Sequence, residues 1–451
     1  KAAQPVVLLD TDLEENHSED RLLTHYLYGG DEAYRLKQEI VLGMGGVRML
    51  QALGFNIREY HMNEGHSALL AVELLKVFAY RREEVRTGES PYDIPRVREV
   101  CNFTTHTPVS AGQDQFPYAL VNRIMDGNAD ISMMRRLAGD ESLNMTRLAL
   151  NLSEYVNGVA KRHAELSNRL FPGYTVHAVT NGVHPFTWTC PEFARLYNQY
   201  VPGWCHEPEL LVRADMAISD DEIWRAHEGA KQRLIEQVRI LGATALDPAL
   251  PIIGFARRMT AYKRPDLLFS SLERLRALAG RHPFQLVIAG KAHPRDDGGK
   301  ALIEQIHRHI RELADVITIA FLPNYDMGKA RLMVAGVDVW LNTPLRPLEA
   351  SGTSGMKAAF NGVPHLSVLD GWWIEGCIEG VTGWAIGNAE ESQNGDDAQS
   401  LYAKLGDVVL PQYYNDRTAW IRIMKGAICK NASFFNSHRM MRRYVSEAYI
   451  R

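Results

Sequence analysis

The sequence predicts an α/β protein with two doubly wound domains that face each other across a cleft. Short apolar runs rich in β-branched residues alternate with longer stretches of helical period. Between residues 290 and 370 the strand-like runs are separated by roughly 15 residues, a spacing typical of right-handed crossovers. At residues 180–193, Gly, Pro and turn-forming residues interrupt this alternation. Parallel sheets covered by helices are therefore expected on both sides of the interruption.

The predicted strands are each a short apolar segment bounded by turn-forming residues. Ligands bind open α/β sheets at the carboxyl ends of the strands, so functional side chains are expected just after these segments. Residues 413–447 have a helical period instead. The strands are predicted at residues 5–10, 56–60, 100–106, 175–181, 251–256, 284–290, 316–321, 337–342 and 364–370.

The length of 451 residues suits two domains. We predict an N-terminal α/β domain at residues 1–185 and a C-terminal α/β domain at 186–430. Residues 431–451 are expected to form a C-terminal helix that packs back across the domain interface. A net charge of −4 gives no electrostatic reason to expect nucleic acid or an anionic membrane as a partner.

The five cysteines are scattered, without CxxC or Cys/His ligand spacing, which favours reduced thiols in the cytoplasm. The segment MNEGH at residues 62–66 does not match HExxH, so no metal site is predicted. No apolar run reaches the length that spans a bilayer, and the N-terminus lacks the apolar centre of a signal peptide. We expect a cytoplasmic protein.

Four cations follow the strand predicted at residues 251–256, in the segment GFARRMTAYKRPD. Arg257, Arg258, Lys263 and Arg264 suit a phosphate, because guanidinium and ammonium groups complement its oxygens. The alternative is a solvated basic helix start.

A glycine-containing turn, EASGTSGMK, follows the strand predicted at residues 337–342. It offers the Glu349 carboxylate, the hydroxyls of Ser351 and Thr353, and Gly352, which lets the backbone approach a ligand. Taken alone, Lys357 is an ordinary helix residue. A lysine that forms a Schiff base must be held near a cofactor phosphate, and this turn offers such a place.

Two further segments place polar residues at strand ends. His106 lies in TTHTPV and Asn181 in TNGVHPFTW. A lone histidine is more often a hydrogen-bonded structural group, and Asn181 with Gly182 needs only a turn.

Together these segments resemble the α-glucan phosphorylases of glycogen, starch and maltodextrin, in particular the shorter microbial branch. Residues 349–376 resemble the family's pyridoxal-phosphate segment, and RRMTAYKR at 257–264 resembles its KRIHEYKR motif. The resemblance implies two facing Rossmann-like domains of the GT-B glycosyltransferase type, with the N-terminal glucan-binding domain incomplete. Further matching segments, in the family's order, are residues 27–39, 62–66, 104–107, 156–166 and 180–188.

The resemblance implies pyridoxal 5′-phosphate as the cofactor, in a Schiff base with Lys357. Arg257 and Thr353 would hold its phosphate, and Tyr325 and Trp188 would line its pocket. Larger family members carry an arginine where this chain has Asp326. The residues assigned to the cofactor are Lys357, Arg257, Thr353, Gly352, Tyr325 and Trp188.

The implied reaction is phosphorolysis of the non-reducing end of an α-1,4-glucan to glucose 1-phosphate, with retained anomeric configuration. The cofactor phosphate would pass a proton through inorganic phosphate to the glycosidic oxygen. Two phosphates repel each other in a cleft of low dielectric, so a cationic cluster is needed to hold both. The implied catalytic residues are Arg258, Lys263, His106 and Glu349, and the implied glucosyl-binding residues are Asn181, Ser351, Gly352, Glu349 and His106.

The implied partners are the glucan, inorganic phosphate and glucose 1-phosphate. The family's early glycine-rich loop has no counterpart in this sequence, so we expect a homo-oligomer or a complementing N-terminal segment. Two alternatives stay open. One is a nucleotide-sugar glycosyltransferase of the glycogen or starch synthase type, which would give Lys357 no covalent role. The other is a non-catalytic glucan-binding fragment.

Overall fold

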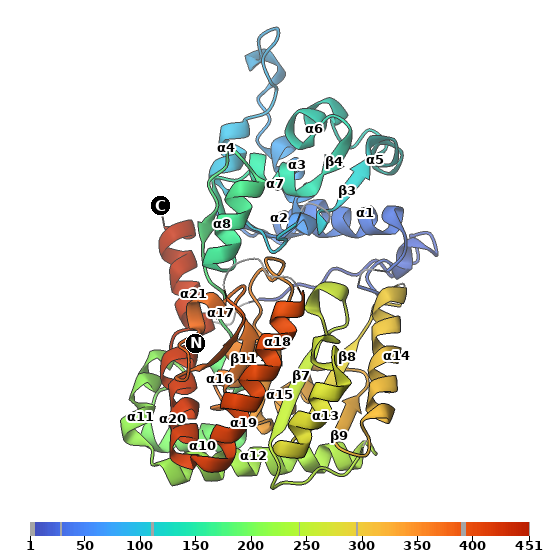
Figure 1. The fold of residues 1–451 in the computed structure, drawn as a ribbon. Helices are drawn as coiled ribbons and strands as arrows, with labels where there is room; N and C mark the ends of the chain where they lie inside the picture. The colour runs from blue at the N-terminus through green and yellow to red at the C-terminus, as the bar shows by residue number, and fades with distance from the viewer. Residues whose placement is uncertain are drawn as a thin grey trace. The chain divides into compact units, whose positions relative to one another are not determined.

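The computed structural model describes residues 5–27, 29–109, 112–242, 244–294, 296–388 and 394–450 (Figure 1). The chain divides into two compact units. Both combine helices with a parallel sheet, which confirms the predicted α/β class. Unit 1 comprises Lys1–Val159, Ala164–Ala178 and Glu447–Arg451, and unit 2 comprises Ala160–His163 and Val179–Ser446.

Unit 2 contains a six-stranded sheet in which all neighbouring strands run parallel. The strand order is β12-β11-β10-β7-β8-β9. The chain therefore builds one half outward from β7, then crosses back and builds the other half outward from β10. In such doubly wound sheets the ligand crevice lies where the order reverses, here between β7 and β10. The strands are β7 Ile252–Arg258, β8 Gln285–Lys291, β9 Thr318–Leu322, β10 Val339–Asn342, β11 His365–Val368 and β12 Gly383–Ile386.

Helices cover both faces of this sheet because its apolar side chains alternate between the faces. On β7, Ile253 and Phe255 belong to a core cluster with residues of α13, α14 and α18. Ile252 and Ala256 belong to a second cluster with residues of α12, α15 and α16. The helices of this unit are α9 Pro185–Trp188, α10 Pro191–Tyr200, η6 Pro208–Arg213, α11 Ala214–Ala217, α12 Asp220–Ile240, η7 Ala261–Lys263, η8 Leu267–Phe269, α13 Leu272–Arg281, α14 Asp297–Glu312, α15 Met327–Gly336, α16 Ser354–Ala359, α17 Trp373–Gly376, α18 Asn394–Lys404, η9 Leu405–Val409, α19 Leu410–Asn415, α20 Arg417–Gly426, η10 Ala427–Ala432, α21 Ser437–Tyr444 and η11 Val445–Tyr449, whose last residues belong to unit 1.

A buried charged group fastens α12 to the amino end of the sheet. Asp338, directly before β10, contacts His227 Nε2 at 2.8 Å and Lys231 Nζ at 2.9 Å. It also accepts a hydrogen bond from the Ile252 amide at 2.7 Å. Burial acts to raise the pKa of Asp338, but Lys231 and His227 outweigh it and lower that pKa. We call Asp338, His227 and Lys231 the Asp338 network.

Unit 1 contains a four-stranded parallel sheet of order β1-β2-β5-β6 and a separate antiparallel pair, β3 and β4. Its strands are β1 Tyr60–Asn63, β2 Cys101–Thr104, β3 Gln115–Pro117, β4 Ser142–Asn144, β5 Tyr155–Gly158 and β6 His177–Ala178. Its helices are η1 Asp20–Leu22, α1 Glu32–Ile40, η2 Val41–Gly45, α2 Gly46–Ala52, η3 Gly65–Ser67, α3 Leu69–Val77, η4 Arg82–Glu84, α4 Ile94–Glu99, α5 Tyr118–Met125, α6 Ile131–Ala138, α7 Met145–Asn151 and α8 Lys161–Leu170, whose first residues belong to unit 2.

Most predicted strands form, but the strand predicted at residues 5–10 does not. That segment has no regular structure, and Val6 and Leu8 are more than four-fifths exposed. An apolar run forms a strand only where a neighbouring strand satisfies its backbone. The strand predicted at 56–60 overlaps β1 only at Tyr60. The sequence analysis missed β3, β4, β5 and β12, each of three or four residues, whereas residues 413–447 are largely helical as predicted.

Within the described ranges, no helix combines the length and apolar character needed to cross a membrane.

Candidate functional site

Three of the predicted site residues form a buried ion cluster at the point where the strand order of unit 2 reverses. Arg257 lies near the carboxyl end of β7, Lys263 ends η7, and Glu349 lies in the loop after β10. One oxygen, Glu349 Oε2, accepts from Arg257 Nη2 at 2.7 Å and from Lys263 Nζ at 2.6 Å. The three side chains are 7–11% exposed. Sequence analysis placed these residues at strand ends but did not predict that they pair.

The cluster sets the charge of its members. Burial acts to raise the pKa of Glu349, but Arg257 and Lys263 outweigh it, so the pKa is lowered and the group is a carboxylate at neutral pH. Burial and the Arg257 charge lower the pKa of Lys263 to about 8, although Glu349 acts in the opposite direction. The Lys263 ammonium therefore titrates close to physiological pH.

The cluster has unused capacity to bind an anion. Arg257 Nη1 is buried and has no hydrogen-bond partner among the described residues. Arg258, the last residue of β7, is exposed, and its charge acts on Lys263. Burial raises the pKa of the Tyr325 phenol to about 12, while the charge of the nearby Arg257 opposes that change. A buried, unpaired guanidinium N–H is expected to find a partner, and a phosphate oxygen provides one.

The loop that carries Glu349 is held by the segment after β11. Asp370 accepts hydrogen bonds from the amides of Glu349 and Gly371, both at 2.9 Å, and the Trp372 amide donates to the Ser351 carbonyl at 2.8 Å. Gly371 has φ +55°, and a Cβ there would lie 2.3 Å from that carbonyl oxygen. Only glycine fits at this position, so the turn fixes the backbone beside the carboxylate.

A second brace joins the Lys263 segment to the same loop. Arg264 is buried and donates to the carbonyls of Thr343 at 2.9 Å and Pro344 at 2.7 Å, and to Asp397 at 2.6 Å. Arg346 contacts the other oxygen of Asp397 at 2.5 Å. The fourth predicted cation, Arg264, therefore fixes the backbone next to Lys263, and its guanidinium is taken up by these protein groups.

Lys357 lies on α16, and its amine is 4.0 Å from the ring centroid of Trp188. No ion pair joins this amine to any residue in the described part of the chain. Burial lowers the pKa of Lys357. An ammonium over an indole face is stabilised electrostatically, and desolvation increases the fraction of free amine. Trp188 and Tyr325 pack partly buried against the core cluster that includes Ala358 of α16.

The remaining residues of the turn lie between Glu349 and Lys357. Gly352 has φ +71°, and the Ser351 hydroxyl donates to the Gly352 carbonyl at 3.3 Å. Thr353 is the N-cap residue of α16, but its side chain makes no capping hydrogen bond.

The other two predicted glucosyl-binding residues, Asn181 and His106, have partners of their own. The Asn181 carbonyl accepts from Arg439 at 2.9 Å, and the neighbouring Val183 pairs its backbone with residues 435–437. His106 belongs to unit 1. There its amide donates to Glu64 at 2.6 Å, and its Nε2 lies 2.5 Å from the Asn63 side-chain oxygen.

One group of described residues has the ligand types of a metal site. Glu39, His66 and Asp114 bring ligand atoms within 4.8 Å of one another in unit 1. The guanidinium of Arg35 lies among them, 2.9 Å from Glu39 and 3.0 Å from Asp114. An arginine already supplies the positive charge there, so the group is explained as an ion-pair cluster.

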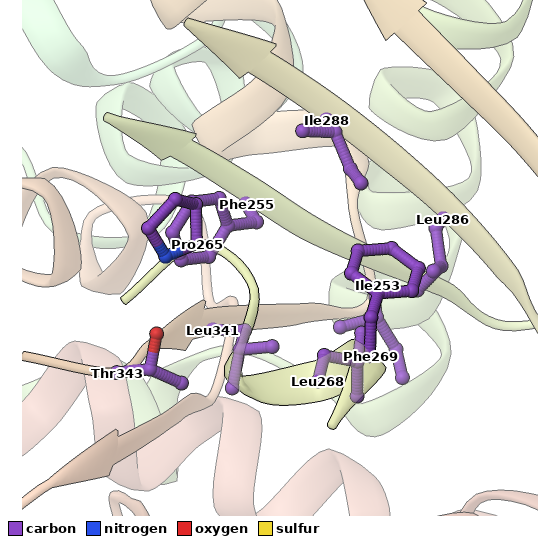
Figure 2. A pocket seen from close by; sticks show the side chains of 9 residues that line it. All are labelled: Ile253, Phe255, Pro265, Leu268, Phe269, Leu286, Ile288, Leu341 and Thr343. Atoms are coloured by element: carbon purple, nitrogen blue, oxygen red, sulfur yellow. The ribbon is translucent and has the colours of Figure 1, made fainter. Parts of the chain in front are cut away.

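A small apolar cavity of about 10 Å³ lies in the core of unit 2 (Figure 2). Its walls are almost entirely hydrocarbon, so it is a packing defect and not a substrate site. The lining residues are Ile253, Phe255, Pro265, Leu268, Phe269, Leu286, Ile288, Leu341 and Thr343.

Comparison with known proteins shows the family of the chain. The family model described as carbohydrate phosphorylase matches residues 123–381, more than half of the chain. The glycogen phosphorylase of Aquifex aeolicus is 38% identical over 98% of this chain and 70% of its own length. The chain belongs to the carbohydrate phosphorylase family. This confirms the resemblance to α-glucan phosphorylases.

Other relatives in the phosphorylase family are longer. The maltodextrin phosphorylase of Thermococcus litoralis is 40% identical over 98% of this chain and 57% of its own length. The glycogen phosphorylase of Mycobacterium tuberculosis is 37% identical over 99% of this chain and 58% of its own length. The chain thus spans less than two thirds of these two relatives.

The sequence analysis missed two residues that organise the site, Asp370 and Asn361. Each precedes a glycine, Gly371 or Gly362, and both glycines have positive φ. Asp-Gly and Asn-Gly predict a turn, and the turn alone explains them from sequence. The buried side-chain hydrogen bonds they make depend on segments far away in the chain.

Proposed function

We propose that this chain carries the catalytic machinery of an α-1,4-glucan phosphorylase. The reaction is retaining phosphorolysis at the non-reducing end of glycogen, starch or maltodextrin, and the product is glucose 1-phosphate. The observation that carries this proposal is the buried cluster of Arg257, Lys263 and Glu349 at the reversal of the strand order. The same unit contains the Lys357 amine, which lies against the ring of Trp188.

The residues of unit 2 fit pyridoxal 5′-phosphate. Arg257 Nη1 is a buried donor with no partner among the residues described, and Lys357 offers an amine whose pKa burial lowers. Pyridoxal phosphate, when bound, would supply a phosphate group able to act as a proton relay toward the substrate phosphate. In this proposal Lys357 anchors the cofactor, Arg257 and Thr353 bind its phosphate, and Gly352, Tyr325 and Trp188 line its pocket.

Arg258 and Lys263 are proposed to bind the substrate phosphate. Arg258 is exposed and close enough for its charge to act on Lys263, so both can reach the same anion. Positive charge at this place favours two phosphates that would otherwise repel each other.

Glu349, Ser351, Asn181 and His106 are proposed to bind the glucosyl unit. The lowered pKa of Glu349 favours a carboxylate that accepts a sugar hydroxyl and does not act as a proton donor. Its attachment to two cations also makes it a poor nucleophile, in agreement with a reaction in which phosphate attacks the anomeric carbon.

We further propose the GT-B arrangement, in which a glucan-binding N-terminal domain at 1–185 faces the cofactor domain at 186–430, and residues 431–451 pack back across the interface. The reversed strand order of unit 2 supports the Rossmann-like part of this proposal. The proposed partners are glucan, inorganic phosphate and a second copy of the chain. A cytoplasmic location is supported by five free cysteines.

Two measurements test the function. The purified chain is incubated with pyridoxal phosphate, reduced with borohydride and mapped by peptide mass spectrometry. Selective modification of Lys357, with exposed Lys300 unmodified as the internal control, is expected. An unmodified Lys357 would exclude the cofactor role and favour a nucleotide-sugar transferase. Glucose 1-phosphate release from maltodextrin and phosphate then distinguishes an active enzyme from a glucan-binding fragment.

A further inference from the structure

The contact between Lys357 and Trp188 joins two helices that are remote in sequence. The amine lies 4.0 Å from the indole centroid, inside the range in which a cation is attracted to an aromatic face. Lys357 is on α16 and Trp188 is the last residue of α9. Both side chains have several rotatable bonds, so something in the backbone must hold the two helices in register.

Asn361 supplies that link. Its Nδ2 donates to the Trp188 carbonyl at 2.8 Å and to the Lys357 carbonyl at 3.1 Å, while its Oδ1 accepts from the Cys190 amide at 2.7 Å. Asn361 has no exposed surface. Both N–H groups and the oxygen of the carboxamide therefore meet complementary groups. A flipped amide would place its oxygen against two carbonyls.

The carbonyls that Asn361 binds are the ones that helix ends leave without partners. In a continued helix the Asn361 amide would bind the Lys357 carbonyl, but it binds the Ala358 carbonyl at 2.9 Å instead. The Trp188 carbonyl belongs to the last residue of α9 and so also lies at a helix end. Gly362, with φ +64°, turns the chain directly after Asn361. One side chain thus completes both helix ends.

We propose that Asn361 is a positioning residue that holds the Trp188 indole over the Lys357 amine. This inference rests on the proposed role of Lys357 as the cofactor anchor. By fixing both backbones, Asn361 sets the position of the amine relative to the indole in the chain without cofactor. Neither the family resemblance nor the ion cluster assigns it this role.

Tyr197 offers a matched control. Its hydroxyl donates to the Phe360 carbonyl at 2.9 Å, so it also joins α10 to the end of α16. Like Asn361 it is completely buried. It binds neither the Trp188 carbonyl nor the Lys357 carbonyl. Tyr197→Phe therefore removes one buried hydrogen bond at the same helix end without touching the pair.

The test uses the full chain without cofactor, labelled with 5-fluorotryptophan. The Trp188 fluorine signal is assigned by its loss in Trp188→Phe and is followed from pH 6 to pH 11. Titration of the amine is expected to move this signal, and Lys357→Met is expected to abolish the movement. In Asn361→Ala the amplitude should fall about threefold, because the field of a charge moved from 4 Å to roughly 7 Å falls by that factor. In Tyr197→Phe it should stay within a factor of 1.5.

Several outcomes would overturn the inference. They are a Trp188 titration that survives Lys357→Met, an unchanged amplitude in Asn361→Ala, or an equal loss in Tyr197→Phe. The other tryptophan signals report whether each variant is folded. If Asn361→Ala does not fold, Asn361→Ser, which has one donor in place of two, is expected to give a reduced amplitude, and an unchanged one would overturn the inference. Because no cofactor is present, the result is independent of borohydride labelling at Lys357.

Discussion

Replacing Glu349 by glutamine should destabilise unit 2 far more than an ordinary loss of a surface ion pair. Glu349→Gln preserves shape but removes the charge that neutralises Arg257 and Lys263, which contact the same oxygen at 2.7 and 2.6 Å. Breaking a buried pair by removing one partner costs about 3–5 kcal/mol, because a charge is left uncompensated. We expect the lower end, about 3 kcal/mol, since the glutamine oxygen still accepts a hydrogen bond.

The chain provides its own probe and control for this measurement. All eight tryptophans lie between Val179 and Ser446, so tryptophan fluorescence follows the unfolding of unit 2 in urea. Glu236→Gln is the control, because Glu236 pairs with Arg239 in two hydrogen bonds but both side chains are more than half exposed. That substitution should leave the urea midpoint unchanged.

A rescue variant separates charge from packing. Adding Lys263→Met to Glu349→Gln removes one of the two uncompensated cations, so it should restore part of the lost free energy of unfolding. The reasoning is refuted if Glu349→Gln leaves the midpoint unchanged, if Glu236→Gln shifts it equally, or if the double variant is less stable than Glu349→Gln alone.

Four further predictions concern unit 2. Asp338→Ala leaves the buried lysine of the Asp338 network unpaired and should cost about 3–5 kcal/mol in the same urea experiment; a loss below 1 kcal/mol would contradict it. Because the pKa of Lys263 is about 8, the affinity for inorganic phosphate, measured by calorimetry, should fall as the pH rises from 7 to 9. In Lys263→Arg, which keeps its charge, the affinity should not fall. The pKa of folded Lys263, about 8, also lies below the 10.5 of an unfolded lysine, so the unfolded chain binds more protons between these two pH values. The free energy of unfolding in urea should therefore rise with pH across that window in the wild type but not in Lys263→Met. Gly371→Ala should lower the urea midpoint more than Gly380→Ala, because both have positive φ but only the first places a Cβ against the Ser351 carbonyl; equal losses would show that the close approach is unimportant.

The sequence determined the α/β class and the place of the site through local chemistry. Apolar runs alternating with helical stretches predicted most strands of unit 2, because strand and helix periods are properties of neighbouring residues. Arg257 and Glu349 could be expected near one sheet edge, because parallel strands end on the same side. The role of Lys357 as the cofactor-binding lysine could be inferred only from the family resemblance.

The tertiary structure decided which of these residues meet. The strand order that puts β7 beside β10 cannot be derived from the order along the chain, yet it brings Glu349 to Arg257 and so sets the charge of Lys263. The apolar side chains of residues 5–10 predict a strand, but these residues pair with no strand in the described part of the chain and have no regular structure. Asn361 and Asp370 gain their roles from carbonyls and amides in distant segments. Short-range patterns fix what a segment can form, whereas packing fixes its partners, and the chemistry of this site depends on those partners.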